Sequence, residues 1–338
     1  MRCAIVDPAG DHKYVYVDRE PPSPGPGEVV LQMRAASLNW RDNFLRLHHD
    51  TGYGDARGRV PLSDGVGVVA ALGAGVAGFA LGDRVCPNFF LHWVDGAPTV
   101  ETIGRALGGS LDGVLAEEMV VPAACLVHAP AHLTDAEAAT LPCAGVTAWV
   151  SLVERGQARA GDTVLVQGTG GVSVFVLQFA KALGVRTIVI SSSDEKLERA
   201  RALGADETLN YRAHPDWDVA ARELTDGRGV DHIVEVGGAE TLPRSLNAMA
   251  LGAHLAIVGG LTGFGAEIPT SALAQRFARL SIVYVGARAS FERMNDFIAA
   301  QRIRPPVDRT FGFEEGQAAA EQLASGAHFG KLAIQIAA

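Results

Sequence analysis

Residues 164–184, VLVQGTGGVSVFVLQFAKALG, run from a short apolar segment through a glycine-rich turn into an amphipathic segment. The apolar run predicts a buried strand, and the amphipathic run predicts a helix that follows the turn directly. The turn consists of Gly168, Thr169, Gly170, Gly171, Val172 and Ser173. Gly168 can make the tight turn, and Gly170 lets a ligand approach the backbone closely. The free N–H groups at the helix N-terminus then favour a phosphate, so the segment predicts a dinucleotide-binding turn.

Strands and helices alternate on the carboxyl side of this turn. Apolar strand-like runs at 186–192, 231–238, 254–260 and 281–287 are separated by helical patterns at 195–204 and 241–252. Such alternation predicts an α/β fold with a doubly wound parallel sheet of the Rossmann type. A tight turn in an α/β protein without a ligand would show the same glycines. The order of strand, turn, helix and further strands favours the dinucleotide site instead.

The amino-terminal part has a different pattern, because short strands follow one another without helices. Strands are expected at 28–39, 65–72, 83–89 and 115–121, after a proline-rich loop at 21–28. Several short strands of this kind predict a small barrel. Thr134 and Glu137 form a capping-box pattern that predicts the start of a helix running to about residue 156. The tail from about 290 has the pattern helix, loop, helix and strand, and is expected to return to the first domain.

Composition excludes several classes of protein. The chain has 338 residues and a net charge of −9, without a run of Lys and Arg, which argues against nucleic-acid binding. No apolar stretch reaches the roughly 18 residues of a membrane span, and the first residues resemble two short strands rather than a signal peptide. Its four cysteines are widely spaced, without a C-x-x-C pair. We therefore expect a cytoplasmic protein that binds neither membrane nor nucleic acid.

The end of the second strand of the α/β region predicts which dinucleotide binds. NAD-dependent proteins carry an acidic residue there for the ribose 2′-hydroxyl, but this chain has Ser191, Ser192 and Ser193. These hydroxyls, with Lys196 and Tyr211 nearby, suit the 2′-phosphate of NADP(H). Asp194 and Glu195 argue the other way. They are interpreted as first-turn residues of a helix, where negative charge is favourable.

The chain as a whole resembles the medium-chain dehydrogenases/reductases, in particular their zinc-independent, quinone-oxidoreductase-like branch. The resemblance covers nearly the full length and is carried by PGPGEVVLQMRAASLNWRD, PLSDGVGVV, GDRV, LPCAGVTAW, VQGTGGVS, SSSDEKLERARALGAD, NYR, DGRGVDHIVEVGG and the terminal HFGK. It implies a GroES-like catalytic domain at 1–122, completed by 290–338. It also implies a Rossmann NADP-binding domain at 123–289, with the active site in the cleft between the two.

The resemblance also locates the positions at which zinc-dependent relatives hold their catalytic metal. They fall on Asn39, on the pair Ser63-Asp64, and on Cys143. Only Cys143 is a good zinc ligand, whereas a catalytic site needs three protein ligands. The cysteine cluster of a structural zinc lobe is missing too. No metal is therefore expected, and Cys143 can equally be a small apolar residue of the substrate pocket.

Further cofactor contacts carry over from the family by position. The resemblance implies that Thr147 touches the nicotinamide, that Val285 and Gly286 approach its amide, and that other residues line the ribose path or return from the tail near the cofactor. These others are Gly237, Val258, Gly259, Phe329, Gly330 and Lys331. A homodimer is also expected, because 281–287 has the character of an apolar edge strand and relatives of this type pair there.

Without a metal electrophile, the reaction class follows from where negative charge develops. Reduction of an enone or a quinone spreads the charge, so a hydrogen-bond donor can stabilise it. Candidate donors are Asn39 and Tyr53, with Asp42 bracing the site, and Trp40 and Phe90 as an apolar pocket wall. The prediction is an NADPH-dependent reductase of a small conjugated carbonyl compound. An alcohol dehydrogenase or ketone reductase, and a dinucleotide-binding protein with little turnover, remain alternatives.

Overall fold

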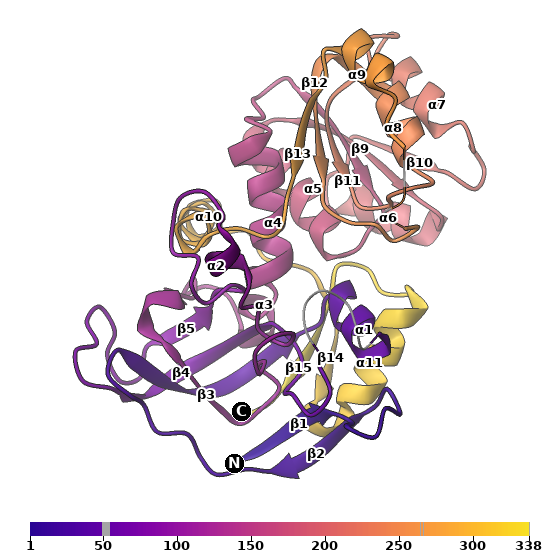
Figure 1. Cartoon of the computed structure of the whole chain (residues 1–338). Helices are drawn as coiled ribbons and strands as arrows, with labels where there is room; N and C mark the ends of the chain where they lie inside the picture. Colours follow the sequence, from indigo (N-terminus) through magenta and orange to yellow (C-terminus); the bar gives the residue numbers. More distant parts are fainter. Residues whose placement is uncertain (49–54, 264, 266, 338) are drawn as a thin grey trace. The chain divides into compact units, whose positions relative to one another are not determined.

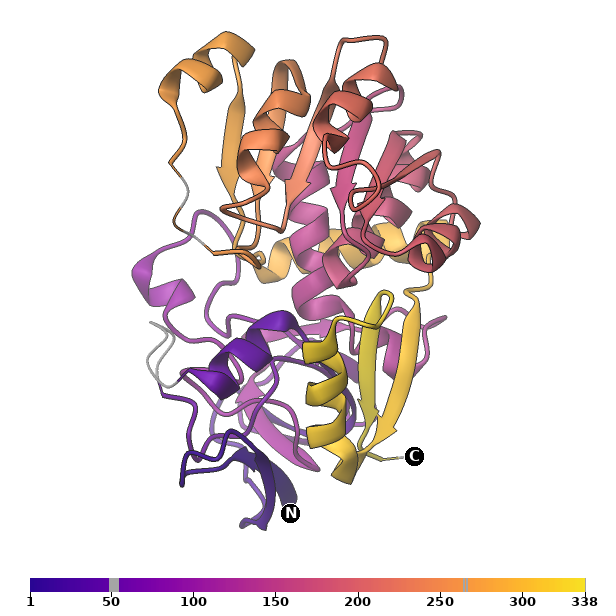
Figure 2. The same ribbon diagram turned by 90° about the vertical axis from the view of Figure 1, so that its right-hand side faces the viewer.

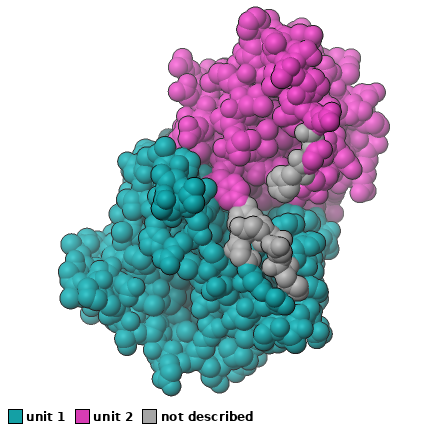
Figure 3. Space-filling model, in the orientation of Figure 1, with its two compact units in different colours: residues 1–146, 285–338 teal, residues 147–284 magenta. Residues whose placement is uncertain are grey.

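A computed structural model describes residues 1–48, 55–263, 265 and 267–337. The chain forms two compact units, drawn in different colours in Figure 3. Unit 1 comprises Met1–Val146 and Val285–Ala338, and unit 2 comprises Thr147–Tyr284.

Unit 2 is built on a six-stranded sheet in which every neighbouring pair is parallel. Its strands are β8 (Thr163–Gln167), β9 (Arg186–Ser191), β10 (Glu207–Asn210), β11 (Val230–Glu235), β12 (Met249–Ile257) and β13 (Arg279–Ile282). Across the sheet the strands lie in the order β10-β9-β8-β11-β12-β13. The chain thus adds β8, β9 and β10 toward one edge of the sheet, and then β11, β12 and β13 toward the other edge. This is the strand order of a Rossmann sheet, so the α/β prediction is confirmed. Figure 2 shows the strands side by side.

Helices connect these strands and cover the sheet (Figure 1). They are α5 (Gly171–Leu183), α6 (Asp194–Ala202), α7 (Trp217–Glu223), α8 (Leu242–Ala248) and α9 (Thr270–Arg276). Both α5 and α6 pack against β9, and α8 packs against β11. The central strands β8, β9 and β11 are almost entirely buried because helices cover them, which explains their nearly continuous apolar sequences.

Unit 1 contains a seven-stranded sheet and a separate amino-terminal hairpin. The hairpin pairs β1 (Arg2–Val6) with β2 (Tyr14–Asp18). The sheet contains β3 (Glu28–Ser37), β4 (Asp64–Leu72), β5 (Arg84–Pro87), β6 (Glu118–Pro122), β7 (Leu126–His128), β14 (Val307–Gly312) and β15 (Lys331–Gln335). The long strand β3 pairs with β6 along its first half and with β15 at its end. The described strands thus form a sheet with ends at β14 and β7 rather than a closed ring.

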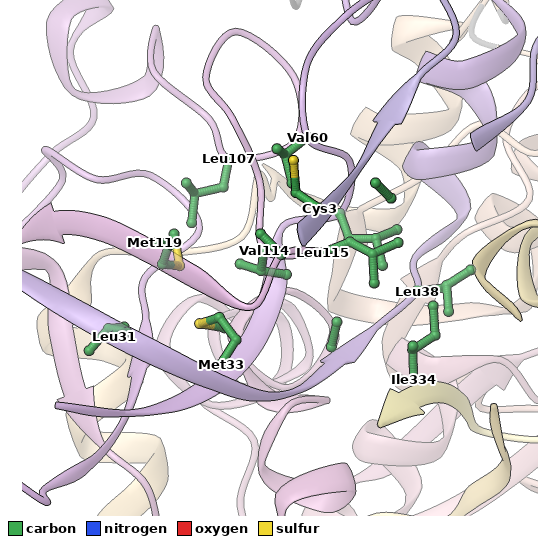
Figure 4. Close-up of a cluster of buried hydrophobic side chains, with 14 of the residues drawn as sticks. Cys3, Leu31, Met33, Leu38, Val60, Leu107, Val114, Leu115, Met119 and Ile334 are labelled. Atoms are coloured by element: carbon green, nitrogen blue, oxygen red, sulfur yellow. The ribbon is translucent and has the colours of Figure 1, made fainter. Parts of the chain in front are cut away.

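Helices of unit 1 come from both parts of the chain. They are α1 (Trp40–Leu47), α2 (Val100–Ile103), α3 (Asp135–Ala138), α10 (Arg288–Gln301) and α11 (Gly316–Ser325), with short 3-10 turns at Ala123–Cys125 and Phe313–Glu315. The core between the sheet and these elements includes Cys3, Leu31, Met33, Leu115 and Ile334 (Figure 4). Because Ile334 of the tail packs in this core, the carboxyl terminus is part of unit 1.

The boundaries of the units differ from the expected domain limits at 122/123 and 289/290. Residues 123–146 belong to unit 1 because β7 pairs with β5 and the Cys143 N–H group donates to Asp64. Residues 285–289 belong there because Arg288 and Ala289 donate to the carbonyls of Trp93 and Val94. The expected helix from Thr134 exists, with its capping box. It continues through π-helical turns at Leu141–Gly145 and Val150–Arg155, which flank α4 (Val146–Trp149).

Candidate functional site

The glycine turn of unit 2 has the local geometry of a phosphate-binding site. Gly168 has a φ of +70°, and Gly170 caps the amino terminus of α5 in an extended conformation. A Cβ atom at Gly170 would meet no other atom within 4 Å, so space is open beside the backbone. Ser173, at the third fingerprint position, donates from Oγ to the Gln167 carbonyl over 2.6 Å and ties α5 to β8. The turn therefore fits a dinucleotide pyrophosphate.

The residues predicted to select the dinucleotide meet at the carboxyl ends of β9 and β10. Ser191 is buried, and its carbonyl accepts a hydrogen bond from the Tyr211 N–H group over 3.1 Å. Ser193 caps α6 by accepting from the Lys196 N–H group over 3.4 Å. The carboxylate of Asp194, whose negative charge argues against NADP(H), accepts a 2.8 Å hydrogen bond from the Asn210 side chain. Ser191 and Ser193 thus stand where an NAD-binding acid would stand, with the backbone of Lys196 and Tyr211 beside them.

A buried carboxylate that the sequence did not single out organises the loop after β11. Glu235 is fully buried, and its Oε1 accepts from the N–H groups of Gly237 and Gly238, over 2.8 and 3.0 Å, and from the Thr241 hydroxyl, over 2.6 Å. Its main-chain carbonyl accepts from the N–H groups of Val258 and Gly259. These contacts hold Gly237, Val258 and Gly259 in place. An acid ending an apolar strand directly before a Val-Gly-Gly loop is the signal that could have revealed it.

In unit 1, a lysine from the tail lies against the residue expected at the first metal-ligand position. Lys331, the first residue of β15, is 3% exposed. Its Nζ atom donates to the Leu38 carbonyl over 2.5 Å and to Asn39 Oδ1 over 2.6 Å. Asn39 precedes α1 and donates its own N–H group to Asp42 Oδ2 over 2.7 Å. Asp42 therefore fixes the backbone at Asn39, and Lys331 fixes the side chain.

A second carboxylate, Asp64, completes this polar cluster. Asp64 is fully buried and accepts from Ser63 Oγ over 2.7 Å and from the Cys143 N–H group over 3.0 Å. Burial raises its pKa, against the opposing influence of Lys331. Burial likewise raises the pKa of Asp42 to about 6, although the Arg41 guanidinium acts in the opposite direction. The two carboxyl groups thus share a desolvated region with the Lys331 ammonium.

The Asn39 side chain retains one unused donor. Asn39 is 8% exposed, and its Nδ2 atom makes no hydrogen bond to any described residue. The amide lies near Asp64 and helps to lower the pKa of that carboxyl group. Buried donors without a partner are rare in folded proteins. An N–H group of this kind is suited to donate to a bound ligand.

The other predicted residues have varied environments. Trp40 is 48% exposed at the start of α1, whereas Phe90 is 1% exposed and packs on Phe89 and Trp93. Phe90 is therefore buried, whereas Trp40 is accessible to solvent. Cys143 is partly exposed, and burial of its thiol raises the pKa, so the thiol stays neutral at physiological pH. Tyr53 lies outside the described residues.

The positions expected near the nicotinamide include one strained backbone. Val285 has a φ of +56°, which is unusual for a β-branched residue and costs conformational energy. Thr147 and Phe329 are buried, at 3% and 2% exposure. A strained residue at a predicted cofactor contact agrees with the tendency of strain to occur at functional sites.

The residues at the metal-ligand positions do not fit a catalytic zinc. Asp64 is engaged by Ser63 and by the Cys143 backbone, and a lysine ammonium, itself a cation, already binds Asn39. No group of three His, Cys, Asp or Glu side chains within the described ranges is arranged to hold a metal ion. An amide, a neutral thiol and one carboxylate beside a lysine are a poor donor set for Zn²⁺.

Comparison with known proteins agrees with both units. Residues 25–131 match the alcohol dehydrogenase GroES-like domain, and residues 171–300 match the zinc-binding dehydrogenase domain. The chain is 42% identical over 326 residues to the zinc-type alcohol dehydrogenase-like protein C1773.06c of Schizosaccharomyces pombe, covering 92% of this chain and 91% of the relative. The chain belongs to the medium-chain dehydrogenase/reductase superfamily. Its unit 1 is GroES-like and its unit 2 is a Rossmann domain.

Other members of this superfamily connect the chain with more than one activity. It is 34% identical over 251 residues to a quinone oxidoreductase of Pseudomonas aeruginosa, covering 73% of this chain and 70% of the relative. The structure of a putative alcohol dehydrogenase from Sinorhizobium meliloti 1021 matches with a TM-score of 0.91 and 39% identity, covering 99% of each chain. This medium-chain dehydrogenase/reductase is thus an oxidoreductase, with a nicotinamide dinucleotide as the cofactor indicated by its glycine turn. None of its described helices is long and apolar enough to cross a membrane.

Proposed function

We propose that the protein is an NADPH-dependent reductase that transfers hydride to a conjugated carbonyl, an enone or a quinone, without a catalytic metal. The observation that carries the proposal is the Asn39 amide. Its oxygen is held by Lys331, its backbone is held by Asp42, and its buried Nδ2 donor has no described partner. Bound NADPH would supply the hydride, and the chain would supply binding and charge stabilisation.

In this proposal, unit 2 binds the cofactor and unit 1 stabilises the developing charge. The turn at Gly168–Gly171 and the amino terminus of α5 bind the pyrophosphate, while the groups around Ser191 receive the 2′-phosphate. Asn39 Nδ2 donates to the substrate oxygen as negative charge grows on it. A single preorganised amide is a weaker electrophile than a metal ion, which is why an enolate or a phenolate suits it better than an alkoxide.

The test compares acceptors and one variant. Oxidation of NADPH should be measured with quinones, vinyl ketones, the matching saturated ketones and simple aldehydes. We expect quinones or enones to be reduced faster than the saturated ketones. Asn39→Ala should lower kcat on the best acceptor by about a hundredfold or more, as expected for an oxyanion donor, while the NADPH Kd changes little. Asn247→Ala, which removes an exposed amide on α8, is the matched control and should keep full activity.

Three results would overturn the proposal. Faster reduction of saturated ketones than of their unsaturated counterparts would favour the alcohol dehydrogenase activity that several relatives' names suggest. Full kcat in Asn39→Ala would remove the residue from the chemistry. Tight NADPH binding without turnover on any acceptor would indicate a binding protein instead.

A further inference from the structure

Lys331 is a buried cation that binds the side chain of Asn39. Its ammonium group is 3% exposed and donates to one carbonyl and one side-chain amide oxygen, both on the segment that leads into α1. Burying an ammonium costs several kcal/mol unless charge and hydrogen bonds compensate. The two hydrogen bonds provide part of this compensation, and Lys331 in turn lowers the pKa of the nearby Asp64 and Asp42 carboxyl groups.

The contact with Asn39 has a direct electronic consequence. When an amide oxygen accepts a hydrogen bond from a cation, electron density shifts toward the oxygen, and the N–H groups of the same amide become stronger donors. The effect is large where the surroundings are desolvated, as they are for these buried groups. The donor that gains is Asn39 Nδ2, which is the one without a described partner.

The same contact also fixes the direction of the amide. With Oδ1 bound to Lys331, rotation of the Asn39 side chain by half a turn would place the NH₂ group against the ammonium and lose the 2.6 Å hydrogen bond. Two elements therefore hold Asn39: β15 holds its side-chain oxygen through Lys331, and α1 holds its backbone N–H group through Asp42.

We propose that Lys331 is a positioning residue: its ammonium orients and polarises the Asn39 amide, so that Nδ2 stabilises the oxyanion of the reduced carbonyl compound. This inference rests on the proposed function for the identity of the acceptor. The role of Lys331 does not depend on which carbonyl compound that acceptor is, because kcat on any acceptor that the enzyme reduces can measure the effect of Lys331.

Lys331→Met tests the proposal because it keeps the length of the side chain and removes the charge. On the best acceptor we expect kcat to fall by roughly tenfold to a hundredfold, with the NADPH Kd and the acceptor KM within threefold of the native values. Lys331→Arg, which keeps a cationic donor, should recover part of the loss. Lys13→Met, at an exposed lysine of unit 1, is the matched control and should leave kcat unchanged.

A double-mutant cycle separates action through Asn39 from a general structural effect. If Lys331 acts through Asn39, then Lys331→Met should cost almost nothing further in the Asn39→Ala background. Losses that multiply would overturn the proposal, and so would a loss in Lys331→Met that is explained by weaker NADPH binding. Unfolding temperatures of all variants identify those that fail to fold. If Lys331→Met fails to fold, Lys331→Gln replaces it in the double-mutant cycle, and the same pattern of kcat losses is expected.

A spectroscopic measurement reports on the contact without any turnover. In protein labelled with ¹⁵N-asparagine, the Asn39 side-chain amide resonances, assigned from their loss in Asn39→Ala, should shift downfield in the native protein relative to Lys331→Met. Unchanged resonances would show that the ammonium does not polarise the amide. If the native enzyme reduces neither enones nor quinones, the proposed function fails, while the shift and the kinetic cycle on another acceptor still decide the role of Lys331.

Discussion

The side-chain amide of Gln167 donates from Nε2 to Glu235 Oε2 over 2.7 Å and so links the last residues of two adjacent strands, β8 and β11. Gln167 directly precedes the glycine turn, and Glu235 directly precedes the Val236-Gly237 loop. Ser245 Oγ donates to the same carboxylate oxygen. One buried network thus sets the relative position of the two loops at the carboxyl edge of the sheet, where Rossmann domains bind their ligand.

Glu235→Gln should destabilise unit 2 and weaken cofactor binding. Both carboxylate oxygens only accept hydrogen bonds, so the new NH₂ group would face other donors in a buried site. We expect a loss of about 1–3 kcal/mol in unfolding free energy. The NADPH Kd should rise by up to about tenfold, equivalent to 1.4 kcal/mol. Chemical unfolding and fluorescence titration provide both values. Glu240→Gln, at an exposed acid in the same loop, should change neither.

The protein should prefer NADPH to NADH, and Lys196 should carry part of that preference. A charge-assisted hydrogen bond to the 2′-phosphate is worth about 1.5–3 kcal/mol. Lys196→Ala should therefore raise the NADPH KM by roughly tenfold to a hundredfold and leave the NADH KM nearly unchanged. Steady-state kinetics with both cofactors test this. A native enzyme with equal or higher kcat/KM for NADH would contradict the assignment of the Ser191–Ser193 region.

Purified protein should contain far less than one zinc per chain, and chelators should leave its activity intact. The physical reason is the donor set at Asn39, Asp64 and Cys143, together with the Lys331 cation that binds among them. Elemental analysis and activity after dialysis against EDTA are the measurements. About one zinc per chain, lost together with activity on dialysis, would show this interpretation to be wrong.

We expect a homodimer that pairs through β13. This strand lies at one edge of the unit 2 sheet, and Phe277 and Ile282, beside and within it, are 76% and 73% exposed. An apolar edge strand of this kind favours pairing with a second copy about a two-fold axis. Sedimentation should show a dimer at micromolar concentration, and Ile282→Arg should convert it to a monomer. Val219→Arg, at an exposed apolar residue on α7, should leave it dimeric.

Acid should destabilise unit 2 partly through His254. Burial lowers the pKa of this imidazole to about 4, and the neighbouring His232 and Arg279 act in the same direction. Between about pH 6.5 and pH 4 the unfolded chain therefore binds a proton that the folded protein does not, so stability is lost as the pH falls. The loss at pH 5 should be about 2 kcal/mol.

The test for His254 is urea unfolding at pH 7.5 and pH 5. His254→Gln should lose less stability between the two pH values than the native protein. His214→Gln, at an exposed histidine, should show the native dependence. An identical pH dependence in His254→Gln would rule out this residue as a source of the acid sensitivity.

The amino-acid sequence by itself determined the features that depend on local pattern. Strand, glycine turn and helix around Gly170 follow from spacing alone, because the turn is closed by residues adjacent in the chain. The capping box at Thr134 and the absence of two zinc ligands, at Asn39 and Ser63, are also evident directly. The strand-turn-helix order and the capping box were confirmed because hydrophobic periodicity and capping patterns need no distant partner.

Only the tertiary structure decided which distant residues meet. Lys331 and Asn39 are 292 positions apart in the chain, and Gln167 and Glu235 are 68 apart. Their contacts depend on β15 pairing with β3 and on β8 pairing with β11, which no local pattern specifies. The same long-range pairing places 123–146 in unit 1 and buries Phe90. Buried polar groups must find partners wherever the fold brings them, so their partners become visible only once the strands are paired.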